Sequence, residues 1–247
     1  MAKPTTPILN TGNALASGLV LAIPFTEGSG TPVDFSNTPV TVTPTNAPTW
    51  TSGTLGHEMT FVKASSQWID LGDPAKLQIS GASNISIACG FTPTASSYPS
   101  QLVAKDSDVG GRAYTFDLFG DRVRIYIDGG GGTGPERRSS STLSAGTFYN
   151  AVATYTYASA GIHMYLNGSL NDGSSFNTGS DYNIPTATTN VNIARRNYTA
   201  NYDYLDGSIS YVYVWNRVLT SQEALALHLN PFQMFMFGGL HSMGVGS

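Results

Sequence analysis

The chain has 247 residues, of which 11% are charged, less than half of the share of roughly 25% that is usual for soluble domains. Its 12 basic and 16 acidic side chains give a formal net charge of −4 at pH 7, which offers nucleic acid or an anionic membrane no general attraction. A single cysteine, Cys89, excludes an intrachain disulfide. The N-terminus lacks the apolar core of a signal peptide, and no apolar run approaches the roughly 20 residues that span a bilayer. We therefore expect neither nucleic acid nor a membrane among the partners.

Most of the chain alternates short apolar segments with turns. Residues 1–17 contain Pro4 and Pro7 among small polar residues and have no periodicity, so we expect an arm or linker there. Prolines within residues 38–56 suit short edge strands. In residues 85–91, large apolar side chains alternate with Ser, Ala and Gly, which is typical of a central strand that another layer approaches closely. Further strands are predicted at residues 19–25, 59–61, 68–71, 102–105, 114–119, 123–127, 148–155, 162–166 and 191–194.

The clearest pattern lies near the C-terminus. Residues 208–215 alternate with a period of two, which predicts a long and largely buried strand. Thr220 and Glu223 then form a capping box, in which each side chain accepts from an unpaired backbone amide at a helix start. The helix should run to about Leu229, because Pro231 disfavours helical backbone in the residue before it. About twelve strands and one helix predict an all-β fold, a two-sheet sandwich or jelly roll.

The segments Gly18–Gly30, Met59–Asp70, Leu143–Gly168 and Leu205–Ala224 follow one another in an order that resembles a known family. They are similar to the laminin-G-like jelly rolls of the concanavalin A-like lectin/glucanase superfamily. The resemblance implies an antiparallel two-sheet sandwich over residues 18–229, with one short C-terminal helix. It also implies that the strands at 19–25 and 208–215 share a sheet. Activity does not follow from it, because function depends on sites carried by a fold.

The superfamily includes glycanases, and retaining enzymes of that kind use two carboxylates about 5 Å apart. None of the four glutamates has another acidic residue two to five positions away, and Asp117 and Asp121 flank a predicted turn. The four histidines are scattered singly, without a companion cysteine, which does not suit zinc. No nucleophile elbow supports a serine hydrolase. We expect a protein that is not an enzyme, with a divergent glycoside hydrolase as an alternative.

A structural calcium ion is a second expectation from the resemblance, because such domains often hold one where the opening turn meets the last strand. The residues in those segments are Glu27, Asp34, Asn37 and Asp206. Hard oxygen ligands from carboxylates and backbone carbonyls suit calcium. The alternative is that Asp34 and Asp206 hydrogen-bond their own turns, as aspartate commonly does.

A glycan site is expected between residues 195 and 204, where aromatic rings and planar polar groups gather. Aromatic faces stack on sugar rings, and Arg, Asn or Asp fix the hydroxyls. The candidate residues are Arg195, Arg196, Asn197, Tyr198, Tyr202 and Tyr204. The alternative is that the two arginines form a solvated strand end and that the tyrosines are amphipathic edge residues.

Residues 230–247 form an apolar tail with too many hydrophobic side chains for a free end. The tail either docks on its own domain or meets a neighbouring subunit. Its start, Asn-Pro-Phe-Gln-Met-Phe, resembles tails of such domains in phage structural proteins. We therefore expect a non-catalytic recognition or decoration module on a virion or cell exterior, with a glycan or a neighbouring subunit as partner. A purely structural capsid or tail protein without a ligand is the other alternative.

Overall fold

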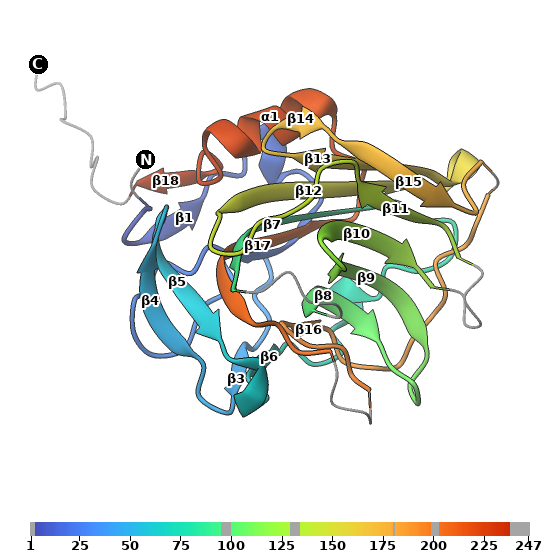
Figure 1. Ribbon diagram of the computed structural model, residues 1–247. Helices are drawn as coiled ribbons and strands as arrows, with labels where there is room; N and C mark the ends of the chain where they lie inside the picture. Colours follow the sequence, from blue (N-terminus) through green and yellow to red (C-terminus); the bar gives the residue numbers. More distant parts are fainter. Residues whose placement is uncertain (1–2, 95–99, 129–133, 180, 199–202, 238–247) are drawn as a thin grey trace, which may run out of the picture.

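The computed structural model describes residues 3–94, 100–128, 134–179, 181–198 and 203–237. Within them the chain forms two large antiparallel sheets that pack face to face, so the predicted sandwich is confirmed (Figure 1). We name each sheet after one of its long strands. The β17 sheet runs in the order β14 (Ser169–Leu170), β13 (Gly161–Leu166), β12 (Tyr149–Thr156), β7 (Ile85–Pro93), β17 (Gly207–Trp215), β5 (Gly56–Phe61) and β4 (Thr49–Gly53), with β2 (Leu19–Ile23) also paired to β17.

The second large sheet, the β9 sheet, has eight strands, and short elements complete the chain. Its order is β15 (Asp172–Phe176), β11 (Glu136–Ser139), β10 (Arg122–Ile127), β9 (Arg112–Phe119), β8 (Ser100–Asp106), β16 (Asn192–Ile193), β6 (Trp68–Asp70) and β3 (Thr43–Thr45). A two-stranded ribbon joins β1 (Pro7–Leu9) to β18 (Phe235–Phe237). The helices are α1 (Ser221–Leu229) and the short 3-10 turns η1 (Ala14–Ala16), η2 (Lys63–Ser65), η3 (Ala75–Leu77) and η4 (Ala158–Ala160).

Strand β17 follows the predicted alternation with one interruption. Ile209 and Val212 belong to the core between the sheets, whereas Tyr211 and Tyr213 belong to a cluster on the outer face. A strict period of two would place Ile209 and Val212 on opposite faces, because they are three residues apart. The register against β7 shifts between Ile209 and Tyr211. This bulge resets the alternation and lets both apolar side chains face the core.

The neighbours of β17 agree with the expected topology. One of its edges pairs with β7, and the other pairs with β5 and then with β2, so the opening and closing strands share a sheet as predicted. Gly90 of β7 lies under the ring of Tyr211, where a Cβ atom would come within 2.4 Å of that ring. The close contact at this glycine thus comes from a side chain of the neighbouring strand in the same sheet and not from another layer. The proline-rich segment supplies β3 and β4, each of which is an edge strand of one of the two sheets.

Helix α1 and the tail cover the outer face of the β17 sheet. Thr220 and Glu223 form the predicted capping box at the start of α1. Phe232, Met234 and Phe235 are buried against the outer cluster of that sheet. Self-docking, the first of the two alternatives for the tail, therefore holds for these three side chains.

The two ends of the chain lie side by side. Residues 7–9 pair with residues 235–237, and the Asn10 amide donates to the carbonyl oxygen of Met234 at 2.9 Å. Leu15 is buried, and its carbonyl oxygen accepts from the indole of Trp215 at 2.7 Å. Residues 3–17, where an arm or linker was expected, thus pack against the domain together with the tail. No helix in the described ranges has the length and apolar character that a membrane span requires.

Candidate functional site

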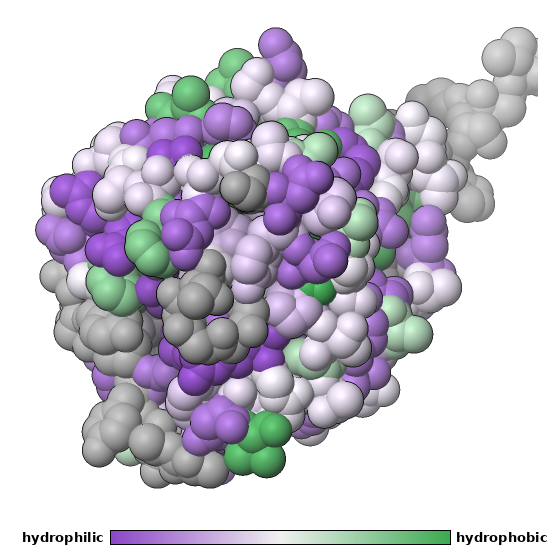
Figure 2. Space-filling model, turned by 90° about the vertical axis from the view of Figure 1, so that its right-hand side faces the viewer, coloured by the Kyte–Doolittle hydropathy of each residue, from purple (hydrophilic) through white to green (hydrophobic). Residues whose placement is uncertain are grey.

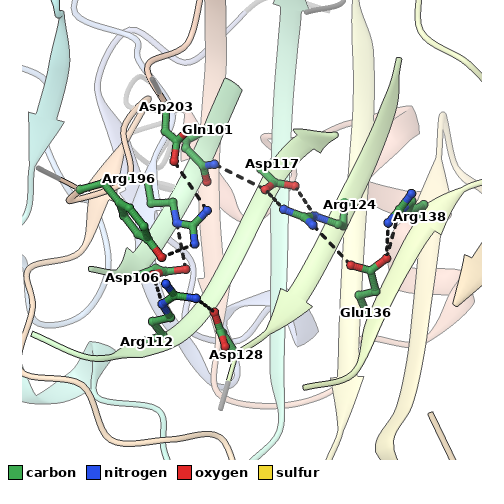
Figure 3. A network of polar contacts seen from close by, with 11 residues as sticks. Gln101, Asp106, Arg112, Asp117, Arg124, Asp128, Glu136, Arg138, Arg196 and Asp203 are labelled. Atoms are coloured by element: carbon green, nitrogen blue, oxygen red, sulfur yellow. Dashed lines mark hydrogen bonds and ion pairs between the residues drawn. The ribbon is translucent and has the colours of Figure 1, made fainter. Parts of the chain in front are cut away.

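The outer face of the β9 sheet carries polar and charged side chains, although its inner face is apolar. On β9, Tyr114 and Phe116 belong to the core, so Thr115 and Asp117 point outward. Arg124 on β10 lies opposite Asp117 in the ladder and therefore on the same face. Figure 3 shows the charged residues that gather there. From the side of β10, β11 and β15 the surface is mostly hydrophilic, with hydrophobic residues in small separate groups (Figure 2).

The first of two ion-pair clusters on this face spans β8 to β11. Asp117 is buried and accepts from Arg124 twice, from Nε at 3.0 Å and from Nη2 at 2.6 Å. Arg124 Nη1 also lies 3.3 Å from Glu136, whose other oxygen is 2.7 Å from Arg138. Gln101 donates to Asp117 at 3.4 Å. The two-bonded geometry fixes the orientation of both partners, which makes this part of the face rigid.

The second cluster is built around two fully buried carboxylates, Asp106 and Asp128. Arg112 lies 2.9 Å from Asp128 and 3.7 Å from Asp106. Arg196 comes from a distant segment and lies 3.1 Å from Asp106 and 3.6 Å from Asp203. The pKa of Asp106 is raised to about 6, mainly by burial and also by the charge of Asp128, although the two arginines oppose the shift.

Several buried polar atoms of the same face have no hydrogen-bond partner in the described part of the chain. They are Gln101 Oε1, Thr115 Oγ1 and both polar side-chain atoms of Asn192. Ala104 of β8 pairs with Asn192 on one side and with Thr115 on the other. The three side chains therefore lie in one row across the sheet, with the small alanine in the middle. Buried polar groups in proteins normally bond to protein, water or a ligand, and leaving one unpaired costs about 1 to 3 kcal/mol. These atoms are buried, so a water molecule or a ligand atom could bond to them only if it displaced the side chains that cover them.

The segment predicted to bind glycans begins directly after β16. Ala194 has a φ of 65°, which turns the chain out of the strand. Arg195 then stacks over Trp68, with its Cζ 4.3 Å from the ring centre, and lies 5.7 Å from the ring centre of Tyr204. Its Nη2 donates to Asn197 at 3.1 Å. These residues form a half-buried patch beside the two clusters.

The next residues of the segment join the buried network. Arg196 Cζ lies 3.9 Å from the ring centre of Tyr198, and Arg112 lies 5.2 Å from the same ring. Arg196 also donates to the Tyr198 hydroxyl. The structure thus brings together Arg195, Arg196, Asn197, Tyr198 and Tyr204, while Tyr202 lies outside the described residues. Their glycan-binding role stays a prediction.

The four residues expected to hold calcium do not form a site that fits the ion. Asp34 is buried, and its oxygens accept from three backbone amides, one hydroxyl and the Lys76 ammonium. Glu27 accepts from a backbone amide at 3.0 Å, burial raises its pKa, and Asn37 is exposed. Asp206 accepts from the backbone of Lys63 at 3.3 Å. No three His, Cys, Asp or Glu side chains in the described ranges lie close enough to hold a metal. Calcium binding stays a prediction without a site.

A lysine ammonium lies at the junction where calcium was expected. Lys3 Nζ lies within hydrogen-bonding distance of four backbone carbonyl oxygens, those of Pro24, Phe25, His57 and Ser210, which share its three N–H donors. Burial lowers the pKa of Lys3 to about 7, while Glu58 and Glu27 oppose the shift. Carbonyl oxygens that would suit a metal cation thus contact the Lys3 side chain instead. Lys3 also lines a surface cleft of about 440 Å³.

The sequence did not lead us to the charged residues of β8 to β10. A signal was present, because residues 112–128 place Arg112, Asp117, Arg124 and Asp128 between apolar neighbours in two adjacent strands. Read with a period of two, Asp117, Arg124 and Asp128 fall on the face opposite the core, whereas Arg112 has the parity of the core residues Tyr114 and Phe116. We considered Asp117 only as half of a catalytic pair with Asp121. In the structure Asp117 pairs with Arg124, and Asp121 lies 3.8 Å from Arg122 with half of its side chain exposed.

The fold is a jelly-roll sandwich of the kind that lectins and glucanases share. The family model described as the concanavalin A-like lectin/glucanases superfamily matches residues 63–224, which is more than half of the chain. The chain belongs to this superfamily. It matches no curated protein in sequence.

Solved structures of similar fold include binding domains of bacterial toxins and of an arabinanase. The binding domain of Paraclostridial Mosquitocidal Protein 1 has a TM-score of 0.67 and 14% identity, over 87% of this chain and 52% of that one. Botulinum neurotoxin type C, reported to depend on two ganglioside molecules for cell entry, has a TM-score of 0.67 and 10% identity, over 89% and 52%. Domain 4 of the Geobacillus stearothermophilus arabinanase AbnA, solved with arabinotriose, has a TM-score of 0.62 and 12% identity, over 85% and 98%. The chain spans about half the length of the two toxin chains.

Proposed function

We propose that the chain is a non-catalytic recognition module that binds glycans on the outer face of the β9 sheet. One observation carries the proposal. The segment after β16 brings Arg196 and Tyr198 to the buried Asp106. Beside them lies the row of Asn192 and Thr115, whose polar side-chain atoms have no hydrogen-bond partner in the described part of the chain. Sugar hydroxyls both donate and accept hydrogen bonds, so they match a surface of amide, hydroxyl, carboxylate and guanidinium groups.

The arrangement of the carboxylates supports binding rather than hydrolysis. A retaining glycosidase presents two carboxyl groups about 5 Å apart, one of them free to act as the nucleophile. Asp117 instead forms a two-bonded ion pair with Arg124, which holds its oxygens toward the guanidinium. Asp106 lies between two guanidinium groups, 3.1 Å from Arg196 and 3.7 Å from Arg112. These contacts suit a rigid polar surface that orients a ligand.

The similar structures favour a glycan over other ligands. The arabinanase domain was solved with arabinotriose, and the type C neurotoxin is reported to interact with gangliosides. A glycan ligand would be displayed outside cells, so the proposal includes action on a virion or cell exterior. A protein partner is the alternative, because a related toxin binding domain was solved with synaptotagmin.

A glycan array with the labelled full chain tests the proposal. We expect the wild type to bind a subset of glycans and Tyr198→Ala to lose at least about ten-fold in affinity, since aromatic and charge-assisted contacts contribute about 1 to 3 kcal/mol each. Tyr157→Ala is the matched control, because this tyrosine follows β12 at an end of the other sheet. Binding that survives Tyr198→Ala, or that Tyr157→Ala removes equally, would place the ligand elsewhere.

A further inference from the structure

Arg195 differs from every other arginine of the chain in its charge environment. The other seven each have an Asp or Glu oxygen within 4.0 Å of a guanidinium nitrogen. Arg195 forms no ion pair with any described residue, and the sequence outside the described ranges contains no Asp or Glu side chain that could supply one. The chain has few charged residues, and all of its other arginines are paired with a carboxylate. Arg195 is therefore an arginine whose charge is available to a ligand.

The surroundings hold the Arg195 guanidinium in place while using only a small part of its hydrogen-bonding capacity. It stacks over Trp68 at 4.3 Å and lies 5.7 Å from the ring centre of Tyr204. A guanidinium has five N–H donors, and the one hydrogen bond from this side chain to a described residue goes to Asn197. Stacking uses the face of the group and leaves its edge for in-plane acceptors. The side chain is half-buried, so part of it is open to solvent while the stacking restricts its orientation.

We propose that Arg195, framed by Trp68 and Tyr204, recognises the carboxylate of an acidic sugar. This inference rests on the proposed glycan-binding function and specifies its ligand class. The planar fork of arginine matches two carboxylate oxygens, which a lysine in the same place would not do. The aromatic rings beside it present apolar faces to the C–H groups of the sugar that carries the acid.

Charge balance explains why this one residue determines the preference. On the same face, Arg112, Arg124 and Arg196 are neutralised by carboxylates that lie between 2.6 and 3.1 Å away. The chain as a whole is negative, so an acidic sugar gains nothing from the long-range field. Its recognition therefore depends on direct contact with Arg195 and weakens as salt screens that contact.

The test compares matched pairs of glycans with and without a carboxylate, for example sialyllactose and lactose, on wild-type protein and Arg195→Met. We expect the wild type to bind the carboxylated members at least ten-fold more tightly and Arg195→Met to lose that preference while keeping its binding to the neutral members. Arg195→Lys should recover only part of it, because a point charge lacks the fork. Arg122→Met, in which another half-buried arginine of the same sheet is removed, should match the wild type in glycan binding.

The possible failures are distinguishable. Equal binding of both members by the wild type, or a preference that survives in Arg195→Met, overturns the inference and leaves glycan binding intact. The inference is also contradicted if Arg195→Met unfolds at the wild-type temperature and yet binds neither glycan of a pair, because binding of the neutral glycan should not need Arg195. Absence of binding to every glycan overturns the proposed function together with this inference.

Discussion

Arg195 and Arg196 are adjacent in the chain, but their guanidinium groups lie in different surroundings. Arg195 Cζ is 4.3 Å from the ring centre of Trp68, and Arg196 Nε is 3.1 Å from the fully buried carboxylate of Asp106. The positive φ of Ala194 turns the chain out of β16 just before them. One short segment therefore supplies a cation without an ion pair in the described residues and a cation paired with a buried carboxylate.

The first prediction compares the two arginines in stability. Arg196→Met removes a buried partner of Asp106, and breaking a buried pair costs about 3 kcal/mol or more. Arg195→Met loses a stacking contact and one hydrogen bond to Asn197, which together are worth about 1 to 2 kcal/mol at a partly exposed site. Urea unfolding of both variants measures the difference. Equal losses of free energy would show that Asp106 does not depend on Arg196.

The second prediction concerns the partnerless hydroxyl of Thr115. Thr115→Val should leave the free energy of unfolding unchanged or raise it by about 1 kcal/mol, because a buried hydroxyl without a partner is unfavourable. The same variant should weaken glycan binding. Thr189→Val is the control: its hydroxyl accepts from Asn197 at 2.9 Å, so its loss should cost about 1 kcal/mol. A destabilised Thr115→Val with normal binding would mean that this hydroxyl serves the fold.

The third prediction is a pH dependence that comes from Asp106. Its pKa is about 6 in the folded protein, raised mainly by burial, against about 3.9 in an unfolded chain. Between those values the folded protein binds a proton that the unfolded chain does not, so this contribution to stability is gained as the pH falls through 6 and lost as it rises. The charged groups around it are Arg196, Arg112 and Asp128.

Unfolding of wild type and Asp106→Asn between pH 4.5 and 7.5 measures this contribution. The wild type should gain stability relative to the variant toward the acid end of the range. The difference between the two free energies of unfolding cancels the contributions of the other carboxylates that titrate in this pH range. A difference that does not change with pH would contradict the raised pKa.

The fourth prediction uses two methionines of the docked tail. Met234 is fully buried, whereas nearly half of Met236 is exposed. Met234→Ala should lower the free energy of unfolding by about 2 to 5 kcal/mol through lost contacts and a cavity. Met236→Ala should change it by less than about 0.5 kcal/mol. Both variants should stay monomeric if the tail serves its own domain, and light scattering checks this. A wild-type dimer that dissociates in Met236→Ala would favour a neighbouring subunit.

Features decided by local sequence could be predicted. The capping box needs only Thr220 and Glu223, three residues apart, and it is present with both of its hydrogen bonds. The hairpin turn at Gly120 also follows from neighbouring residues, and the residues on either side of the turn pair as expected. The shared sheet of the opening and closing strands came from the family resemblance, because the two strands are nearly 200 residues apart.

The site could be predicted only in part, because it depends on strand order. Arg196 reaches Asp106 because two-residue β16 lies beside β8, and no periodicity can be detected over two residues. Pairing of residues 7–9 with residues 235–237 was missed for the same reason. The aromatic and basic composition of residues 195–204 did indicate that stretch, since its side chains are too polar for a core and too aromatic for an ordinary loop.

The account depends most on glycan binding at the outer face of the β9 sheet. Titration of isotope-labelled protein with the best ligand from the array, followed by amide chemical shifts, locates that binding directly. We expect the largest shifts in β8, β9 and β16 and at residues 195–198. Shifts confined to other surfaces, or no shifts with any glycan, would contradict the account.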